Sequence, residues 1–216
     1  MGLTERQRVP SELSVGRWTL NVERFPAMRQ PIRVRAFTLI ELLVVISIIA
    51  VLIGLAFPAF QAVQNSAKRT QAKNDLTQIV TAVNAFYTEY GKYPVAGAQG
   101  QGDVTLGEGT PNIALIRTLM GKDLAENPRQ IAFFIPPIAQ QDGAYGVVLD
   151  DQGRPESNFN TPWSQPAGKV EYRVKIDTNY DSQVSDPDSA QRMLPHGVIA
   201  WCPGKSANVP KIYSYK

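Results

Sequence analysis

The longest apolar run of the chain covers residues 37–57 and contains a single charged residue, Glu41. At a helical rise of about 1.5 Å per residue, roughly 20 apolar residues match the ~30 Å hydrocarbon core of a bilayer. A buried helix of a soluble protein rarely stays apolar on every side over such a length. The run therefore predicts a membrane-spanning helix.

A helical pattern continues along residues 58–90. Apolar residues recur there at spacings of three and four, namely Leu76, Ile79, Val80, Val83, Phe86, Tyr87 and Tyr90. The charged residues that lie off this stripe are Lys68, Arg69, Lys73, Asp75 and Glu89. Pro58 lacks a backbone N–H and would end or kink a helix, but the pattern resumes after it. We therefore predict one helix from about Phe37 to Tyr90, ended by Gly91 as a C-cap.

The remainder, residues 91–216, has short apolar runs separated by turn residues. A short helix is predicted within residues 111–120, ended by Gly121. Residues 170–176 alternate apolar and polar side chains, which is typical of a strand with one buried face. The predicted strands are residues 131–135, 145–149, 170–176 and 198–202, with a fifth candidate at 212–215. The pattern predicts an α+β fold in which a small antiparallel sheet packs over the second half of the long helix.

Charge is distributed unevenly along the chain. Residues 1–36 hold seven Arg and three Glu, a net charge of +4, whereas residues 37–216 hold 15 Lys and Arg against 16 Asp and Glu, a net charge of −1. Positive charge before the apolar run, with no basic residue after it until Lys68, predicts that the N-terminal side stays in the cytoplasm and the C-terminal part is exported. Since the basic excess belongs to the leader, a nucleic-acid partner is not expected.

Candidate catalytic residues are few. The chain has one cysteine, Cys202, which excludes an intramolecular disulfide, and one histidine, His196. Neither residue belongs to a zinc-type spacing, and no nucleophile-elbow motif accompanies His196. We therefore expect a protein that is not an enzyme.

Glu41 is unusual because a carboxylate within an apolar span is costly unless it reaches the headgroups or has a partner. It could snorkel at the cytoplasmic boundary, or it could pair with a new α-amine of Phe37 if the chain were cut after Ala36. Residues 36–42, Ala-Phe-Thr-Leu-Ile-Glu-Leu, resemble the cleavage and N-methylation signature of type IV prepilins and type II secretion pseudopilins. Pro58 would be residue 22 of the mature chain, a position where this family typically has proline. The family usually has Gly before the cut, where this chain has Ala36.

The resemblance implies how the chain would be processed and assembled. A prepilin peptidase would remove the leader 1–36 and methylate Phe37. Residues 37–57 would then form the membrane and filament-core helix, 58–90 its amphipathic continuation, and 91–216 an exported globular domain. The implied assembly residues are Phe37, Glu41 and Pro58. An ordinary signal peptide is disfavoured, because it would have a shorter apolar region and be cut after it.

The resemblance also implies partners and a location. The partners would be the prepilin peptidase, other pilin or pseudopilin subunits, the inner-membrane assembly platform and the membrane. The chain would cross the inner membrane once, with its C-terminal domain in the periplasm, until it is extracted into a filament. Whether translation starts at Met1 or at Met28 stays open, because the nine residues 28–36 resemble the short leaders of the family.

Three further segments resemble type II secretion pseudopilins in particular. Tyr93-Pro94 directly follows the predicted long helix, and Asn127-Pro128-Arg129 precedes an apolar run. Residues 160–163, Asn-Thr-Pro-Trp, resemble the Asp-Pro-Trp-Gly turn of that group, and we interpret Trp163 as a core anchor. A structural pseudopilin is therefore favoured. The alternatives are a type IV or competence pilin of a surface fibre and a membrane-anchored exported enzyme or binding domain.

An acidic segment follows the third predicted strand. Oxygen-bearing side chains at alternate positions suit Ca²⁺, and an EF-hand-like loop would take its ligands from Asp177, Asn179, Asp181 and Asp188. The match is incomplete, since Ser182 stands where that loop has glycine and the segment follows a strand rather than a helix. Major pseudopilins bind Ca²⁺ in a C-terminal loop, which this segment resembles. The alternative is a solvated acidic turn.

Overall fold

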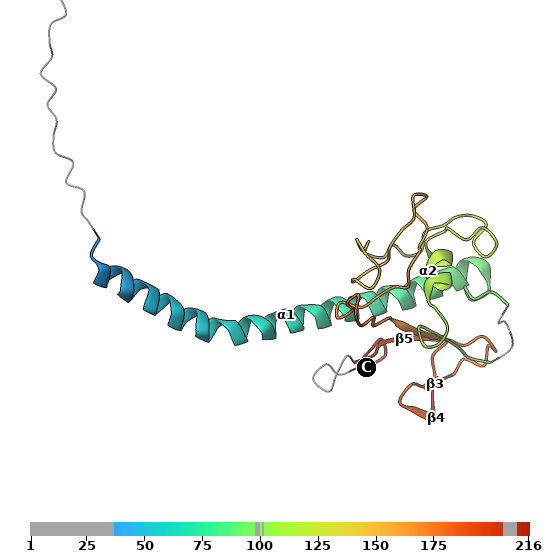
Figure 1. The fold of residues 1–216 in the computed structure, drawn as a ribbon. Coiled ribbons are helices and arrows are strands. Elements are labelled where there is room, and N and C mark those ends of the chain that lie inside the picture. The colour runs from blue at the N-terminus through green and yellow to red at the C-terminus, as the bar shows by residue number, and fades with distance from the viewer. Residues whose placement is uncertain (1–36, 98–99, 101, 205–210) are drawn as a thin grey trace, which may run out of the picture. The chain divides into compact units, whose positions relative to one another are not determined.

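The structure is a computed structural model that describes residues 37–97, 100, 102–204 and 211–216. The leader, including Met28 and Ala36, lies outside the described residues. The chain forms two compact units, one up to Ile48 and one from Ile49 to Lys216. Helix α1, Leu39–Tyr90, is the long helix of Figure 1. Its residues up to Ile48 belong to the first unit, and its residues from Ile49 belong to the second unit.

Helix α1 continues through Pro58, as the sequence pattern predicted. Its residues up to 70 are exposed, and a buried stripe then begins, consisting of Ala72, Asp75, Leu76, Ile79, Ala82, Val83 and Phe86. Gly91 ends the helix at φ 67°, and its N–H donates to the Tyr87 carbonyl at 2.8 Å, which confirms the C-cap. The sequence analysis placed Tyr87 on the buried stripe and Asp75 off it. Both assignments were wrong, because Tyr87 is 39% exposed and Asp75 is buried.

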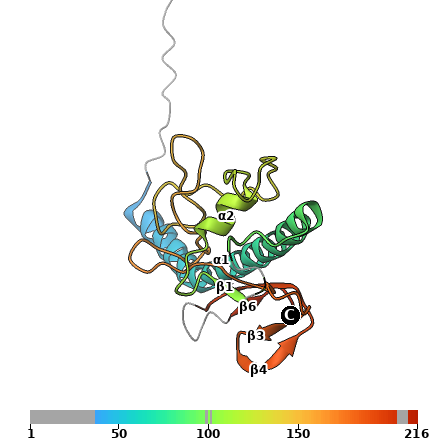
Figure 2. The same cartoon turned by 90° about the vertical axis from the view of Figure 1, so that its right-hand side faces the viewer.

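The C-terminal part contains a short helix and two antiparallel sheets (Figure 2). Helix α2 is Ile113–Leu119, followed by Gly121 at φ 72°. The larger sheet has the order β1-β2-β5-β6, formed by Val104–Leu106, Arg173–Ile176, Val198–Cys202 and Ile212–Tyr213. A separate hairpin pairs β3, Val184–Asp186, with β4, Ser189–Leu194. The predicted α+β fold is therefore confirmed.

Strand β5 is buried on both faces, which explains its continuous apolar sequence. Val198, Ala200 and Cys202 belong to the main core, together with the buried apolar residues of α1. The alternate residues Ile199 and Trp201 belong to a second cluster with Val184 and Leu194 of the hairpin. Successive side chains of a strand point to opposite faces, so β5 contributes to two cores at once.

Two predicted strands are absent from this fold. Residues 131–135 have no ladder, because the N–H groups of Phe133 and Phe134 both donate to the Leu119 carbonyl at the end of α2, at 2.8 and 3.2 Å. Pro136 and Pro137 then follow, and they have no N–H to donate to a ladder. Residues 145–149 form only isolated bridges, such as Gly146 with Asn160.

Candidate functional site

Helix α1 begins with a reciprocal hydrogen-bond arrangement between Thr38 and Glu41. Glu41 Oε2 accepts from the Thr38 backbone N–H at 2.9 Å and from the Thr38 hydroxyl at 2.8 Å, while the Glu41 N–H donates to Thr38 Oγ1 at 3.3 Å. This is a capping box, with Thr38 before the first helical turn and Glu41 three residues later. The Thr-x-x-Glu spacing is its sequence signal, which our sequence predictions missed.

The capping box bears on the two explanations that the sequence left open for Glu41. Both Thr38 and Glu41 lie after the proposed cut, so cleavage before Phe37 would keep the box. Among the described residues, the hydrogen bonds to this carboxylate all use Oε2. Oε1 is thus available to a cation on a neighbouring chain, and the cap aims the carboxylate back toward the helix start.

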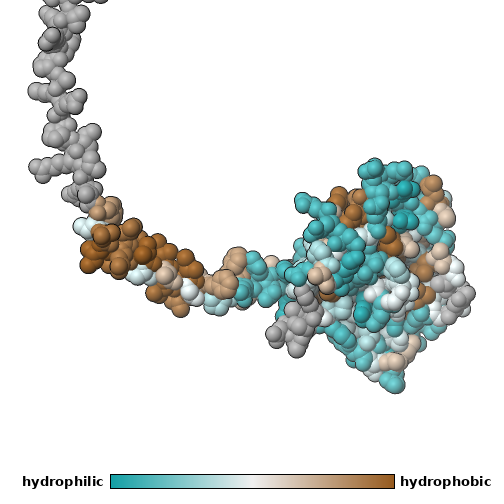
Figure 3. Space-filling model, viewed as in Figure 1, coloured by the Kyte–Doolittle hydropathy of each residue, from teal (hydrophilic) through white to brown (hydrophobic). Residues whose placement is uncertain are grey.

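Apolar side chains cover the first part of α1. Residues 37–63 are exposed throughout, with Leu39 at 88% and Val63 at 66% (Figure 3). The helix is long and apolar enough to cross a membrane, and its most apolar stretch is not buried in the structure. Such a continuous exposed apolar surface needs a cover, which lipid or other apolar helices can supply. Pro58 falls at the end of the apolar run and leaves one carbonyl of the preceding turn without its helical donor.

Two of the segments that carry the pseudopilin resemblance contact the end of α1, through Tyr93 and Asn127. The Tyr90 hydroxyl donates to Asn127 Oδ1 at 2.6 Å, and Asn127 is fully buried. The Asn127 amide in turn donates to the carbonyls of Thr118 and Ile131 at 2.9 and 2.8 Å. Trp163 is 6% exposed and belongs to the main core, as predicted. These residues therefore fix the loops that cover the long helix.

The structure brings three of the four predicted calcium ligands together, Asp177, Asn179 and Asp181, but not Asp188. Asp177 is 2% exposed and accepts the N–H of Ser182 at 2.7 Å and of Asp181 at 3.3 Å, while the Asn179 amide donates to Asp181 at 2.8 Å. Asp188 instead belongs to the turn of the β3–β4 hairpin, which the sequence predictions missed. Among the described residues, no group of three His, Cys, Asp or Glu is arranged to hold a metal ion. Calcium binding stays a prediction.

Asp103 is a neighbour of this segment that sequence reasoning did not find. Its carboxylate accepts the Ser185 N–H at 3.2 Å. Burial raises the pKa of Asp103, and the negative charges of Asp181 and Asp177 raise it further. Asp103 therefore adds a third negative charge to the surroundings of Asp177 and Asp181.

If Ca²⁺ binds this segment, it should raise the melting temperature of the full chain in detergent by several degrees relative to chelator, because a ligand of the folded state stabilises it. Asp181→Ala should remove the difference, whereas Asp151→Ala, at an exposed carboxylate elsewhere, should retain it. Thermal melts followed by near-ultraviolet circular dichroism would measure this. Melting that is the same with Ca²⁺ and with chelator would leave the segment as an acidic turn.

Asp188 holds the C-terminal strand to the hairpin. Its carboxylate contacts the ammonium groups of Lys211 at 2.7 Å and Lys216 at 3.4 Å and accepts from the Tyr213 hydroxyl. The hydrogen bond from Lys211, followed by that from Tyr213, lowers the pKa of Asp188 to about 2. The carboxylate is partly exposed, so solvent screens these interactions.

Asp188→Asn should lower the melting temperature at pH 7 by a few degrees. The pKa of Asp188 is lower in the folded chain than its value of about 4 in the unfolded chain. The ionised carboxylate therefore stabilises the fold fully above pH 4, and this stabilisation is lost as the pH falls through 2. The difference in melting temperature between the two proteins should therefore be much smaller at pH 2, where about half of the Asp188 carboxyls of the folded chain are protonated. A melting difference that does not change between pH 7 and pH 2 would contradict this role of the charge.

The sequence matches to known proteins include the start of α1, where Thr38 and Glu41 lie. Residues 32–57 match the family model described as the prokaryotic N-terminal methylation motif. The type IV major pilin protein PilA of Myxococcus xanthus is 41% identical over 61 residues, which are 28% of this chain and 28% of that pilin. The type IV major alpha-pilin of Moraxella bovis is 43% identical over 61 residues, 28% of this chain and 38% of that protein. No solved structure gives a significant match.

Proposed function

Because this chain carries the N-terminal region of the type IV prepilin-like family, we propose that it is a structural subunit of a pilus-like filament. The observation that carries the proposal is the exposed apolar part of α1, which follows the Thr38–Glu41 capping box. After leader cleavage, such helices cover one another's apolar surface when they bundle. The exported domains then form the outside of the filament.

Within this class, we favour a type II secretion pseudopilin. Tyr93-Pro94 and Asn127-Pro128-Arg129 support this assignment by resemblance, although the two relatives named above are type IV pilins. The proposed partners are the prepilin peptidase, an inner-membrane assembly platform and further subunits, and the proposed location is the inner membrane with the domain in the periplasm. The chain itself is proposed to perform no catalysis.

The first test concerns processing. Mass spectrometry of the membrane-extracted and filament fractions should find a mature chain that starts at Phe37 and carries one N-methyl group. Ala36→Leu should block the cut, because the family has a small residue there, and the chain should then stay in the membrane with its leader. A matched Ala50→Leu change inside the apolar run should be processed normally. Filaments whose subunits retain residues 29–36 would contradict the proposal.

A further inference from the structure

Basic residues without an ion-pair partner gather where α1 enters the folded domain. Lys68, Arg69 and Lys73 are all exposed, and the ion pairs within the described part of the chain use other basic residues. Like charges this close on one helix repel each other, so they are costly without a counter-charge. An uncompensated positive surface therefore lies at this end of the domain.

Two of these basic residues, Arg69 and Lys73, contribute to one wall of a groove. Arg69 and Lys73 on α1, together with Lys211, Tyr213 and Lys216 from the C-terminal segment, line a groove of about 590 Å³ that we call the basic groove. Asp188 pairs with both Lys211 and Lys216, so one carboxylate serves two ammonium groups. The Lys216 ammonium also lies 4.0 Å from the centre of the Tyr213 ring. The groove thus keeps a positive excess and has room for a side chain.

Three carboxylates that form no ion pair with another described residue gather in a different part of the domain. These are Asp103, Asp177 and Asp181, of which Asp181 is exposed. The half-buried Lys175 offsets part of the charge of Asp103, and its ammonium donates to the Ser185 hydroxyl at 2.8 Å. Asp181 is therefore the carboxylate that presents negative charge at the surface here.

Three tyrosines adjoin these carboxylates. The ring of Tyr93 stacks on Tyr87 at 4.8 Å and on Tyr180 at 5.6 Å. Tyr180 is 42% exposed and sits at φ 62°, a left-handed conformation that a bulky residue rarely adopts. We call Tyr87, Tyr180 and Asp181 the acidic–aromatic patch. Exposed rings beside a carboxylate suit a cationic side chain, above all arginine, which can stack on the ring and pair with the carboxylate.

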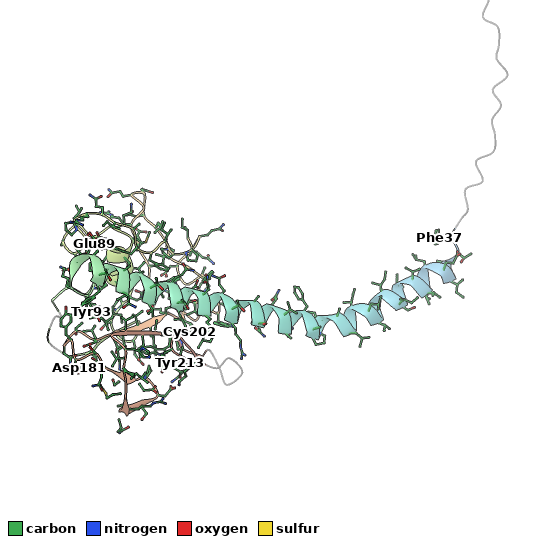
Figure 4. The ribbon with its side chains drawn as sticks, turned by 180° about the vertical axis from the view of Figure 1, so that it is seen from behind. Phe37, Glu89, Tyr93, Asp181, Cys202 and Tyr213 are labelled. Atoms are coloured by element: carbon green, nitrogen blue, oxygen red, sulfur yellow. The ribbon has the colours of Figure 1, made fainter. Side chains whose placement is uncertain are left out.

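The two surfaces of one molecule are too far apart to meet. Lys73 and Glu89 are 16 residues apart on α1, which is about 24 Å of helix axis. The Tyr180 ring, next to Asp181 in the chain, lies 6.2 Å from that of Tyr87 near the C-terminal end of α1. Figure 4 shows Tyr213 nearer the side of the domain where α1 leaves it, with Tyr93 and Asp181 further from that side. The cations of the basic groove can therefore meet these carboxylates only on another copy of the chain.

We propose that the basic groove of one copy receives the acidic–aromatic patch of the next copy, with Arg69 and Lys73 against Asp181 and Tyr180. This inference rests on the proposed function, because it assigns the surfaces by which neighbouring domains meet in the filament. Two different patches on each subunit make a heterologous contact, which propagates into an open filament when the rotation does not close. Electrostatic complementarity then sets the register of neighbouring domains, while the bundled helices hold the filament together.

Charge reversal tests the contact in the full-length chain in the producing cell. Lys73→Glu or Asp181→Lys should each lower the amount of sheared filament about fivefold, because opposite charges become like charges. The double variant should recover most of it, since each contact again joins opposite charges. Lys122→Glu and Asp151→Lys make the same charge changes at exposed sites outside both surfaces, and should leave filament yield unchanged. No recovery in the double variant, with unchanged melting temperatures, would overturn the pairing.

Disulfide cross-linking tests the geometry. A chain carrying both Lys73→Cys and Asp181→Cys should form a ladder of oligomers on mild oxidation, because a disulfide needs Cα atoms within about 7 Å and the two sites of one chain cannot meet. Each single variant alone should give no cross-link, and co-expression of the two single variants should give dimers. Cys202 is 1% exposed and burial raises its pKa to about 12, so it should not react.

The outcomes separate this inference from the proposed function. Dimers from one single variant alone would indicate a symmetric contact and overturn the head-to-tail arrangement. Filaments of N-methylated subunits without the ladder would overturn this inference but leave the proposed function intact. Failure of the unaltered chain to form filaments would overturn the proposed function itself. If the ladder is absent and Lys73→Glu instead weakens binding to phosphatidylglycerol vesicles, the groove binds lipid and the inference is wrong.

Discussion

Glu41→Val is expected to preserve membrane insertion and leader cleavage but to reduce filament yield more than about tenfold. Valine suits the apolar span better than a carboxylate does, so insertion should not suffer. Assembly should fail because the Phe37 amine would enter the apolar helix bundle without a counter-charge. Filament yield in the sheared fraction and the N-terminal mass of the membrane fraction would measure the two effects separately.

The capping box makes a sharper version of this experiment available. Glutamine at the third helical position can replace glutamate in a capping box but carries no charge. Glu41→Gln should therefore keep the helix start and still prevent assembly if the ion pair is what matters. Thr38→Val, which removes the hydroxyl of the box and keeps the charge, should assemble. Normal filaments from Glu41→Gln would show that the charge of Glu41 is not needed and that its role is to cap the helix. Loss of filaments in Thr38→Val, but not in Glu41→Gln, would show that assembly depends on the capping box.

Local patterns made the long helix predictable. Spacings of three and four placed Leu76, Ile79, Val83 and Phe86 in the core, and Gly91 at the C-cap, because helix periodicity and capping depend on residues close in sequence. Phe37 and Glu41 were likewise singled out from a contiguous motif, and their role in assembly stays a prediction. The Thr38–Glu41 box was equally local, so it could have been predicted from its spacing.

Contacts between distant residues account for most of the errors. Residues 131–135 have strand-like composition, but their backbone bonds to the end of α2 and the prolines after them prevent a ladder. Asp188 has the right spacing for a calcium loop, yet the β3–β4 hairpin turns it toward Lys211. Neither outcome can be derived from spacing alone, because each depends on which distant segments pack together.

Asp75 is the clearest case of a residue whose role depends on distant partners. It lies on α1 among charged residues, but it is 2% exposed because three side chains satisfy it. Asp75 Oδ2 accepts from the hydroxyls of Tyr172 at 2.6 Å and Tyr145 at 2.9 Å, and Oδ1 accepts from the Gln71 amide at 2.9 Å. Burial and the nearby Asp75 charge raise the pKa of both tyrosines. The network ties the helix to residues 70 and 97 positions later in the chain.

Asp75→Leu should lower the free energy of unfolding by about 2–5 kcal/mol, because it leaves buried tyrosine hydroxyls without an acceptor. For a chain of this size, that corresponds to a fall in melting temperature of roughly 5–15 °C. Circular dichroism melts of the full chain in detergent would measure it. Asp151→Leu, at an exposed carboxylate, should stay within about 0.5 kcal/mol of the unaltered chain.

The triple variant Asp75→Leu, Tyr145→Phe, Tyr172→Phe distinguishes unpaired hydroxyls from poor packing of the leucine. Removing donors and acceptor together costs far less than removing the acceptor alone, so the triple variant should recover several degrees of the loss. Tyr172→Phe by itself should show an intermediate loss, because Asp75 keeps its bonds to Tyr145 and Gln71. If the triple variant melts no higher than Asp75→Leu, the destabilisation comes from the shape of the leucine, and the hydrogen-bond network is not what fixes the domain to the helix.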